Sequence, residues 1–587
     1  MWRSVPTKPD ATLPASLVAA LLLALPAAAQ TAPPANSVTP KAGVTNDGAA
    51  TPAATPALES PALGPLDGRD TPLLIRPPEG GTLPGFATTA PGLGASGISA
   101  SDLGNRPYAI RPSIGVGVLA TDNLFQSSYY RRSDIVTTIA PSIEAAISTI
   151  RMSGSLRYAP ALRLYANNSD QNGVDQVGDG QFLAALIPGA LYLDVRGSAS
   201  VLPATAGLIP GSGQVVAGGN TVQTYTTQVT PFLVHRFGSA ASSQLGYSFQ
   251  YSRQAGAAFN NSDLAGFDST ANFTAHRGFA VLRSGEDLGR LALQARVDGT
   301  WYVGDGIYDD AHNFVAGLGA RYAILRSVAV VGDIGYENQQ YAGTNPLSIE
   351  DAIWSVGLRL TPSPDSIVIV RYGHRNGFNS FSLNAGVAVG VRTSLFATYS
   401  DTLGTSLTQG QNLLATTTTD ALGNTVDSQS GAPVVLINSF LGLSNTLYRM
   451  RVGTASLSHY WPRDGFTLSG TWQTLDPVTS ANGPLPASSN GIYATFNWAH
   501  EFSPNTTGVA TVQYGRASLG QTGSGGASFG QTGSGDSDTY ALAATLSHRL
   551  SETLTTSIQV AWTSSTSSQA GLGYTQGVIR AGLRRTF

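Results

Sequence analysis

The residues that carry acid–base and nucleophilic chemistry do not gather in this sequence. Ser458 precedes His459 and Ser547 precedes His548, but adjacent strand side chains point to opposite faces, so neither pair forms a hydrolase dyad by itself. The chain has no cysteine, which excludes thiolate metal sites and cysteine nucleophiles. We therefore expect no enzyme activity and no cofactor. The seven histidines lack the HxxxH or HxH spacing of a metal site; they are His235, His276, His312, His374, His459, His500 and His548.

Two other motifs have simple readings. The acid pairs Asp309-Asp310 and Glu350-Asp351 fall in predicted loops, where they either bind a divalent cation or remain solvated charges. A ten-residue repeat places two copies of a Gly-rich sequence at 518–525 and 528–535. It lacks the lysine of a phosphate-binding P-loop, so we interpret it as a mobile surface loop.

Arginines are the set whose spacing suggests a function. They occupy the polar positions of several alternating segments, and rows of arginine in a pore attract anions. The alternative is that they pair with carboxylates of inward-folded loops and fill the interior. Both interpretations stay open at this stage. The predicted lumen-lining residues are Arg151, Arg157, Arg163, Arg296, Arg321, Arg359, Arg371 and Arg580.

These arginines lie in segments with a period of two, which indicates β-strands. Between Ile150 and Tyr165, apolar residues such as Leu156 alternate with Ser155 and Arg157, and only Pro160 interrupts the pattern because it cannot donate a ladder hydrogen bond. The same alternation recurs along the chain at 291–301, 314–324, 354–360, 466–473 and 492–498.

The alternation predicts an all-β fold, a transmembrane antiparallel up-and-down barrel of about 22 strands, with a range of 18–22. Only 12% of residues are charged, against roughly 25% in soluble domains, because one face of every strand must meet lipid. The net charge of −3 implies no overall electrostatic attraction to nucleic acid. Short predicted turns alternate with long loops, as in outer-membrane barrels. The predicted long loops include 166–180, 203–220, 401–445 and 519–536. Predicted long loops carry Asp170, Asp175, Asp179, Asp305, Asp309, Asp310, Asp420, Asp427 and Asp536, so we expect a cationic bore beneath an acidic rim.

The two ends of the chain indicate export to the bacterial outer membrane. Arg3 and Lys8, the apolar run 17–25 and Ala27–Ala29 resemble a signal peptide, predicted over 1–29. Residues 30–105 are rich in proline and alanine and are expected to form a disordered periplasmic linker. The barrel is expected over 106–587.

The final strand resembles the signal that barrel-assembly machinery recognises. It is carried by Arg580, Gly582 and the terminal Phe587, while Arg585 departs from the usual apolar residue. The expected partners are therefore outer-membrane lipid, lipopolysaccharide and this machinery.

Several segments resemble the β-barrel porins found beside exopolysaccharide and capsule gene sets, and the barrels associated with PEP-CTERM sorting. The resemblance is carried by 111–118, 121–125, 133–141, 360–366, 372–375 and 399–401, and it would cover 106–587. It implies an outer-membrane location and a porin-like conduit or scaffold for exopolysaccharide export, with secretion components as partners. The alternatives are a general or anion-selective diffusion or uptake porin, and a structural surface barrel plugged by 401–445.

Overall fold

The computed structural model describes residues 106–203, 221–255, 272–363, 366–405, 407–408, 417–419, 425–427, 446–481, 485–519, 535–568 and 573–587. The predicted signal peptide, 1–29, and the linker, 30–105, lie outside these residues. Within the described ranges, no helix has the length and apolar character needed to cross a membrane.

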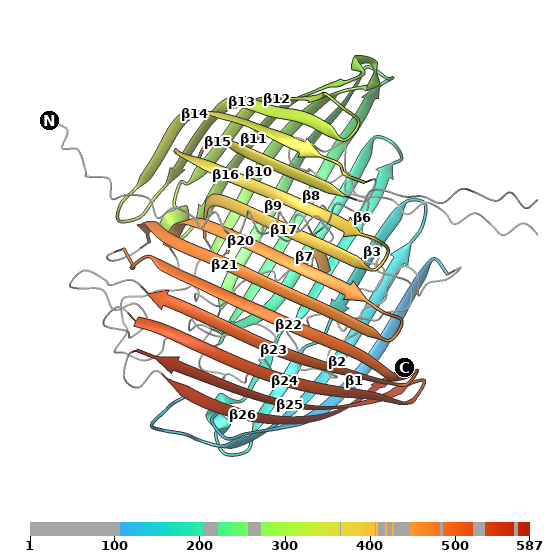
Figure 1. Ribbon diagram of the computed structural model, residues 1–587, viewed down its shortest axis with the longest axis vertical. Coiled ribbons are helices and arrows are strands. Elements are labelled where there is room, and N and C mark those ends of the chain that lie inside the picture. Colours follow the sequence, from blue (N-terminus) through green and yellow to red (C-terminus); the bar gives the residue numbers. More distant parts are fainter. Residues whose placement is uncertain are drawn as a thin grey trace, which may run out of the picture. The chain divides into compact units, whose positions relative to one another are not determined.

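Strands joined in sequence order form one closed antiparallel sheet, because β1 pairs with both β2 and the last strand, β26 (Figure 1). The wall begins with β1 (Tyr108–Thr121), β2 (Asp134–Ser148), β3 (Met152–Tyr158), β4 (Ala161–Tyr165), β5 (Gly173–Asp175), β6 (Gly178–Ile187), β7 (Leu191–Pro203), β8 (Thr221–Phe237) and β9 (Ala241–Ala255). It continues with β10 (Asn272–Ser284), β11 (Leu291–Gly304), β12 (His312–Ala323), β13 (Val328–Tyr341), β14 (Leu347–Leu360), β15 (Ile367–Arg375), β16 (Phe378–Val389) and β17 (Thr393–Gly404).

The ring is completed by β20 (Thr446–Tyr460), β21 (Asp464–Ser480), β22 (Ser489–Ser503), β23 (Thr506–Leu519), β24 (Gly535–Ser551), β25 (Leu554–Ser567) and β26 (Tyr574–Thr586). A separate two-stranded sheet holds β18 (Thr417–Thr419) and β19 (Thr425–Asp427). Three short 3-10 turns, η2 (Ser169–Gln171), η5 (Glu286–Leu288) and η6 (Gly306–Tyr308), interrupt connections between wall strands.

Pro160 breaks the wall where the sequence predicted a defect. β3 ends two residues before this proline and β4 begins one residue after it, while β5 and β6 are interrupted opposite, at Gln176-Val177. The Ala159 N–H still donates to the Val177 oxygen at 2.8 Å, which bridges the two breaks. Since β2 pairs with both β3 and β4, each broken pair is one wall strand. The 24-stranded sheet is therefore a 22-strand barrel, and the predicted fold class is confirmed.

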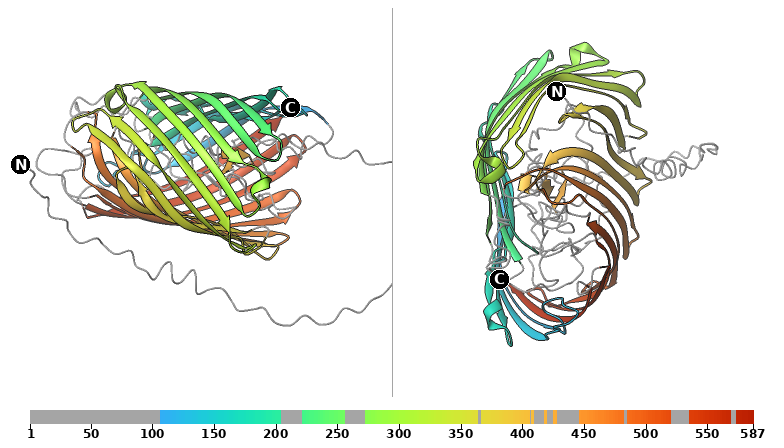
Figure 2. Two further views of the ribbon diagram at one scale, coloured as in Figure 1. Left: turned by 90° about the horizontal axis from the view of Figure 1, so that it is seen from above. Right: turned by 90° about the vertical axis from the view of Figure 1, so that its left-hand side faces the viewer.

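The connections give the barrel two different ends (Figure 2). At one end, consecutive wall strands are joined by turns of two to six residues, and β1 begins and β26 finishes there. Connections at the other end are mostly longer and reach 41 residues, between β17 and β20. The shortest connection there is the two-residue turn Asn376-Gly377, whose φ angles of 57° and 76° suit an Asn-Gly hairpin. We call the two ends the short-turn end and the long-loop end.

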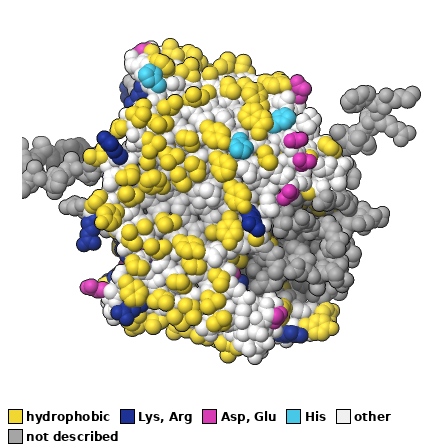
Figure 3. Space-filling model, turned by 180° about the vertical axis from the view of Figure 1, so that it is seen from behind, with side chains coloured by type: hydrophobic (Ala, Val, Ile, Leu, Met, Phe, Trp, Pro, Cys, Tyr) yellow, Lys and Arg dark blue, Asp and Glu magenta, His cyan; other side chains and the backbone are white. Residues whose placement is uncertain are grey.

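The outer face of the wall is apolar and the inner face is polar. Predicted outward residues such as Leu156, Leu293 and Leu468 are exposed, whereas alternate residues such as Gln294, Gln473 and Thr495 are buried. Figure 3 shows one side of the barrel covered largely by apolar side chains. This arrangement is the one that a lipid-facing barrel requires.

Candidate functional site

Seven arginines occupy inner positions of the contiguous strands β10 to β15; Arg375, the last residue of β15, lies at the long-loop end, and the other six lie further towards the short-turn end. Opposite β11, the neighbouring β12 carries Gly317 and Gly319, so small residues flank the long side chains. Gly357 is required beside Arg371, because an added Cβ would lie 2.1 Å from the Val370 oxygen and 2.8 Å from the Arg371 Cγ. We call these other six the arginine wall: Arg277, Arg283, Arg296, Arg321, Arg359 and Arg371.

Fewer carboxylates than arginines face the lumen on these strands. Arg277 donates to Asp298 Oδ2 at 2.7 Å through Nε, and Arg296 lies 3.6 Å from the same carboxylate. Arg371 pairs with Asp333 at 2.8 Å. The third acid, Glu337, is fully buried nearer the long-loop end.

Glu337 is held by polar groups of its surroundings. It accepts hydrogen bonds from the Gln339 amide at 3.1 Å and the Gly377 N–H at 3.3 Å. On the described strands β10 to β15, the arginines at inner positions therefore outnumber the inner carboxylates of the same strands, which are Asp298, Asp333, Glu337 and Asp351. Such an excess in a confined, low-dielectric channel raises the local concentration of anions.

On β3 to β7, in contrast, arginines and aspartates are matched. Arg157 Nη2 donates to Asp179 Oδ1 at 2.6 Å, and Arg163 Nη2 donates to Asp175 Oδ1 at 2.7 Å. Arg196 Nε likewise donates to Asp194 at 2.8 Å. These three pairs contribute little net charge to the lumen.

The placement of Asp175 and Asp179 differs from the sequence-based prediction, which assigned both to a long loop over 166–180. The loop is only 166–172, and both aspartates lie in wall strands, β5 and β6. The prediction was wrong because glycine and polar residues over 173–180 conceal a strand that is interrupted at 176–177. Consequently, the arginines of β3 and β4 find their carboxylates on the adjacent strands.

The remaining predicted arginines lie apart from the arginine wall. Arg151 is exposed in the turn between β2 and β3, outside any strand. Arg580, on β26, donates from Nη1 to the Gln559 side-chain oxygen at 3.1 Å. The structure thus gathers Arg296, Arg321 and Arg359 with Arg371 on neighbouring strands, and disperses the other four.

Sequence reasoning missed a buried polar cluster where the barrel closes. Arg584 on β26 donates to Glu144 on β2 at 2.6 Å and, through Nε, to Ser113 on β1 at 3.0 Å. The Ser113 and Ser142 hydroxyls are 2.5 Å apart. This closure cluster joins the first two strands to the last. The terminal Phe587 adds a backbone hydrogen bond from its N–H to the Pro112 oxygen at 2.9 Å.

Of the residues predicted as an assembly signal, Phe587 lies on the outer face with Ile579 and Leu583, and its ring lies 5.3 Å from the Arg585 guanidinium carbon. Gly582 pairs with Gly117 on β1 and with Ser557 on β25. A role in assembly stays a prediction. Among the described residues, no group of three or more histidine, aspartate and glutamate side chains could hold a metal ion.

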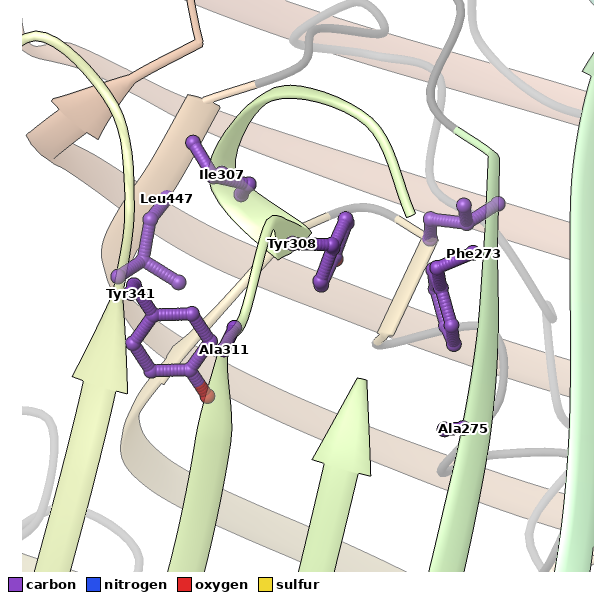
Figure 4. Packing of buried hydrophobic residues seen from close by; sticks show 8 residues of the cluster. Phe273, Ala275, Ile307, Tyr308, Ala311, Tyr341 and Leu447 are labelled. Atoms are coloured by element: carbon purple, nitrogen blue, oxygen red, sulfur yellow. The ribbon is translucent and has the colours of Figure 1, made fainter. Parts of the chain in front are cut away.

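An apolar cluster lies inside the long-loop end (Figure 4). Ile307 and Tyr308 of η6 are fully buried against residues of β10, β13 and β20 and against Leu407, which follows β17. The Tyr308 hydroxyl shares a 2.5 Å hydrogen bond with the Thr405 hydroxyl, and burial raises the pKa of this phenol well above its usual range. We call this the mouth cluster: Phe273, Ala275, Ile307, Tyr308, Ala311, Tyr341, Leu407 and Leu447.

A second contact beside the mouth cluster links strands that are distant in the ring. The turn after β13 meets the end of β21, because the Thr344 N–H donates to the Ser480 oxygen at 2.9 Å and the Thr479 hydroxyl donates to the Ala342 oxygen at 3.2 Å. Five wall strands separate β13 from β21 in the ring. The long-loop end is therefore drawn together across this part of its circumference.

Comparisons with known proteins add no functional assignment. No protein-family model matches the sequence, and no curated protein matches it. Similar solved structures include the ferric-catecholate import receptor Fiu from E. coli K12, with 10% identity, a TM-score of 0.42 and 81% of each chain covered. The siderophore receptor PirA from Pseudomonas aeruginosa has 10% identity and a TM-score of 0.35, covering 81% of this chain and 80% of that chain.

The outer membrane protein opdK from Pseudomonas aeruginosa has 8% identity and a TM-score of 0.31, covering 82% of this chain and 99% of that chain. Values this low leave the function to be argued from this chain's own residues.

Proposed function

We propose that this protein is a bacterial outer-membrane barrel that forms a passive, porin-like conduit for exopolysaccharide export. The observation that carries the proposal is a 22-strand wall with an apolar outer face and a lumen lined by the arginine wall. A barrel with this division of faces suits a lipid exterior and a wet interior. In this proposal, the short-turn end faces the periplasm, where both ends of the wall belong in bacterial barrels.

The outer-membrane location is supported by the predicted signal peptide, 1–29. Cleavage after Ala29 should give a mature protein that begins at Gln30, which mass spectrometry of the membrane fraction would detect. A mature protein that retains Met1 would contradict export by this route.

The conduit is tested by reconstituting the refolded barrel in planar bilayers and measuring single-channel conductance. Open-channel steps support a conduit. The second candidate is a structural barrel plugged by 401–445, most of which lies outside the described residues; it predicts no conductance. The position of the mouth cluster inside the long-loop end, with Leu407 as a member, favours this candidate.

The link to exopolysaccharide rests on the sequence resemblance alone. Deleting the gene should lower secreted polysaccharide, and expression of the wild-type protein should restore it. Normal secretion after deletion, with conductance intact, would favour instead a general or anion-selective diffusion porin.

A further inference from the structure

Arginines surround the opening at the short-turn end. Nine exposed arginines lie in the short turns, within three residues of them, or beside the ends of β1 and β26 at this opening: Arg106, Arg151, Arg236, Arg290, Arg326, Arg392, Arg463, Arg549 and Arg585. In the described part of the chain, none of the nine forms an ion pair. The acids of the same edge are fewer: Asp287, Asp464, Glu501 and Glu552, with Glu286 and Asp365 placed in its turns by sequence.

Two of these arginines hold inner positions of their strands. Arg236 pairs with Ser242, and Arg549 pairs with Thr555. Both partners are in phase with buried inner residues, Gln244 and Ser557 respectively. These guanidinium groups therefore belong to the rim of the lumen.

The outer positions beside these arginines are apolar. Phe237, Trp461 and Phe502 are each about half exposed on the outer face, in the place of the aromatic girdle that marks a membrane interface. Each packs edge-to-face on a histidine two residues earlier, with ring centroids 4.6, 4.6 and 4.7 Å apart. At this edge, aromatic side chains thus occupy outer positions beside the arginines, although Arg585 also stands at an outer position of β26.

Positive charge continues from the rim into the lumen. Arg283, Arg321 and Arg359 lie within the last three residues of β10, β12 and β14 at the short-turn end. At the long-loop end, the exposed arginines of the described chain are Arg131, Arg132, Arg253, Arg375 and Arg516. They are outnumbered there by exposed acids: Asp122, Asp170, Asp305, Asp309, Asp310, Glu350 and Asp351. Counted over these described side chains, the two openings therefore differ in the sign of their charge.

The type of basic side chain at this opening restricts the chemical class of ligand that it would bind. Both lysines of the chain precede residue 42, so every basic side chain of the barrel other than histidine is arginine. The planar guanidinium group forms paired hydrogen bonds with a carboxylate and is more weakly hydrated than an ammonium group. Many such groups around one opening favour a ligand with many carboxylates, because several weak contacts then act together.

We propose that the short-turn opening is a docking vestibule for a linear acidic polysaccharide that carries carboxylates. The proposal rests on the proposed function for its direction, since it places the polymer on the periplasmic side. The positive rim attracts the chain from solution, and the arginine wall extends the attraction inward. Attraction of this kind raises the rate of encounter at one opening and weakens as salt increases.

Binding of fluorescent polygalacturonate to the barrel in zwitterionic lipid nanodiscs tests the proposal, with dextran as the neutral control. We expect polygalacturonate binding that weakens steeply with salt, and no dextran binding. Arg236→Gln/Arg463→Gln/Arg549→Gln should weaken binding at least tenfold. The matched variant at the long-loop end, Arg131→Gln/Arg132→Gln/Arg516→Gln, should bind as the wild type does. The heat-shifted gel mobility of both variants checks that they fold.

Absence of polygalacturonate binding, or equal losses in both variants, would overturn the vestibule. So would a short-turn variant that keeps its polygalacturonate affinity and instead loses bound phosphatidylglycerol, because the arginines would then serve lipid phosphates. Polymer binding does not require an open bore, so the result of the binding assay is independent of the result of the conductance measurement. If the barrel binds the polymer but shows no conductance, the vestibule is supported and the conduit is contradicted. If the barrel conducts but does not bind the polymer, the conduit is supported and the vestibule is contradicted.

Discussion

At the scale of residues, a deeply buried ion pair joins the described residues Arg584 and Glu144 where the barrel closes. Glu144 is fully buried and the Arg584 side chain is 8% exposed, so each charge depends on the other for compensation. Breaking a buried pair by removing one partner costs about 3–5 kcal/mol, because the other charge stays behind unpaired. Arg111, 3.8 Å from the same carboxylate, is a weaker and more exposed neighbour.

We therefore predict that Glu144→Gln destabilises the folded barrel by about 3 kcal/mol or more, measured by urea-induced loss of the heat-shifted gel form. Glu144→Gln/Arg584→Gln should recover part of the loss, because it leaves no unpaired charge. A double variant no more stable than Glu144→Gln would contradict the account. Asp179→Asn is the comparison, since its pair with Arg157 is partly exposed and should contribute only about 1 kcal/mol or less.

This pair also shows what sequence reasoning cannot reach. Arg584 stands four residues from Arg580, which the sequence did single out, but its partner is 440 positions away. Alternation assigns both residues to the inner face and gives no register between the first and last strands. Only closure of the ring brings them together.

At the scale of elements, alternation predicted the faces of the wall correctly, because lipid and lumen impose opposite demands on adjacent residues. It failed where a strand is broken or short of apolar residues, as at 173–180. The inward turn η6 was also missed, since its burial depends on Leu407 and Leu447, which lie far away in the sequence.

The faces can be tested with charged substitutions. Leu156 and Leu468 are 48% and 53% exposed on the outer wall, so Leu156→Arg and Leu468→Arg should each impair membrane insertion. Arginine facing lipid costs roughly 2–4 kcal/mol near the bilayer midplane. Ser155→Arg and Ser469→Arg, one position away on the inner face, should insert normally in a liposome folding assay. Equal effects on both faces would mean that the register is shifted by one residue.

The mouth cluster makes a separate prediction for the long-loop end. Tyr308→Ala removes a fully buried ring and its hydrogen bond to Thr405, with a local cost of about 3–5 kcal/mol. We expect η6 to detach from the strands against which it packs, and the single-channel conductance to rise. Tyr129→Ala, an exposed tyrosine of the β1–β2 loop, is the control and should leave conductance unchanged. Unaltered conductance in Tyr308→Ala would show that the cluster does not limit the bore.

At the scale of the whole molecule, charge is distributed unevenly although the chain is nearly neutral, with a net charge of −3. Sequence alone predicted a cationic bore beneath an acidic rim. The structure moves part of the acid inward, where Asp175 and Asp179 neutralise Arg163 and Arg157. On one side of the lumen, the described strands β10 to β15 carry more inner arginines than inner carboxylates.

We predict from this distribution that the open pore prefers anions. Arg321 and Arg359 lie on the arginine wall near the short-turn end, and the field inside a channel is governed by the charges that line it. Reversal potentials under a KCl gradient should therefore indicate chloride selectivity for the wild type. Arg321→Glu/Arg359→Glu changes the lumenal charge by −4 and should shift the reversal potential towards that of potassium.

The matched control is Arg131→Glu/Arg132→Glu, which makes the same change of charge on the exposed β1–β2 loop, outside the wall. Screening reduces the effect of such exposed charges beyond roughly 10 Å at 0.1 M salt, so selectivity should change less. A cation-selective wild type would mean that the acids of the long-loop end govern permeation. Equal shifts of the reversal potential in both variants would contradict a specific role for the arginine wall, since charge at the mouth alone would then account for the selectivity.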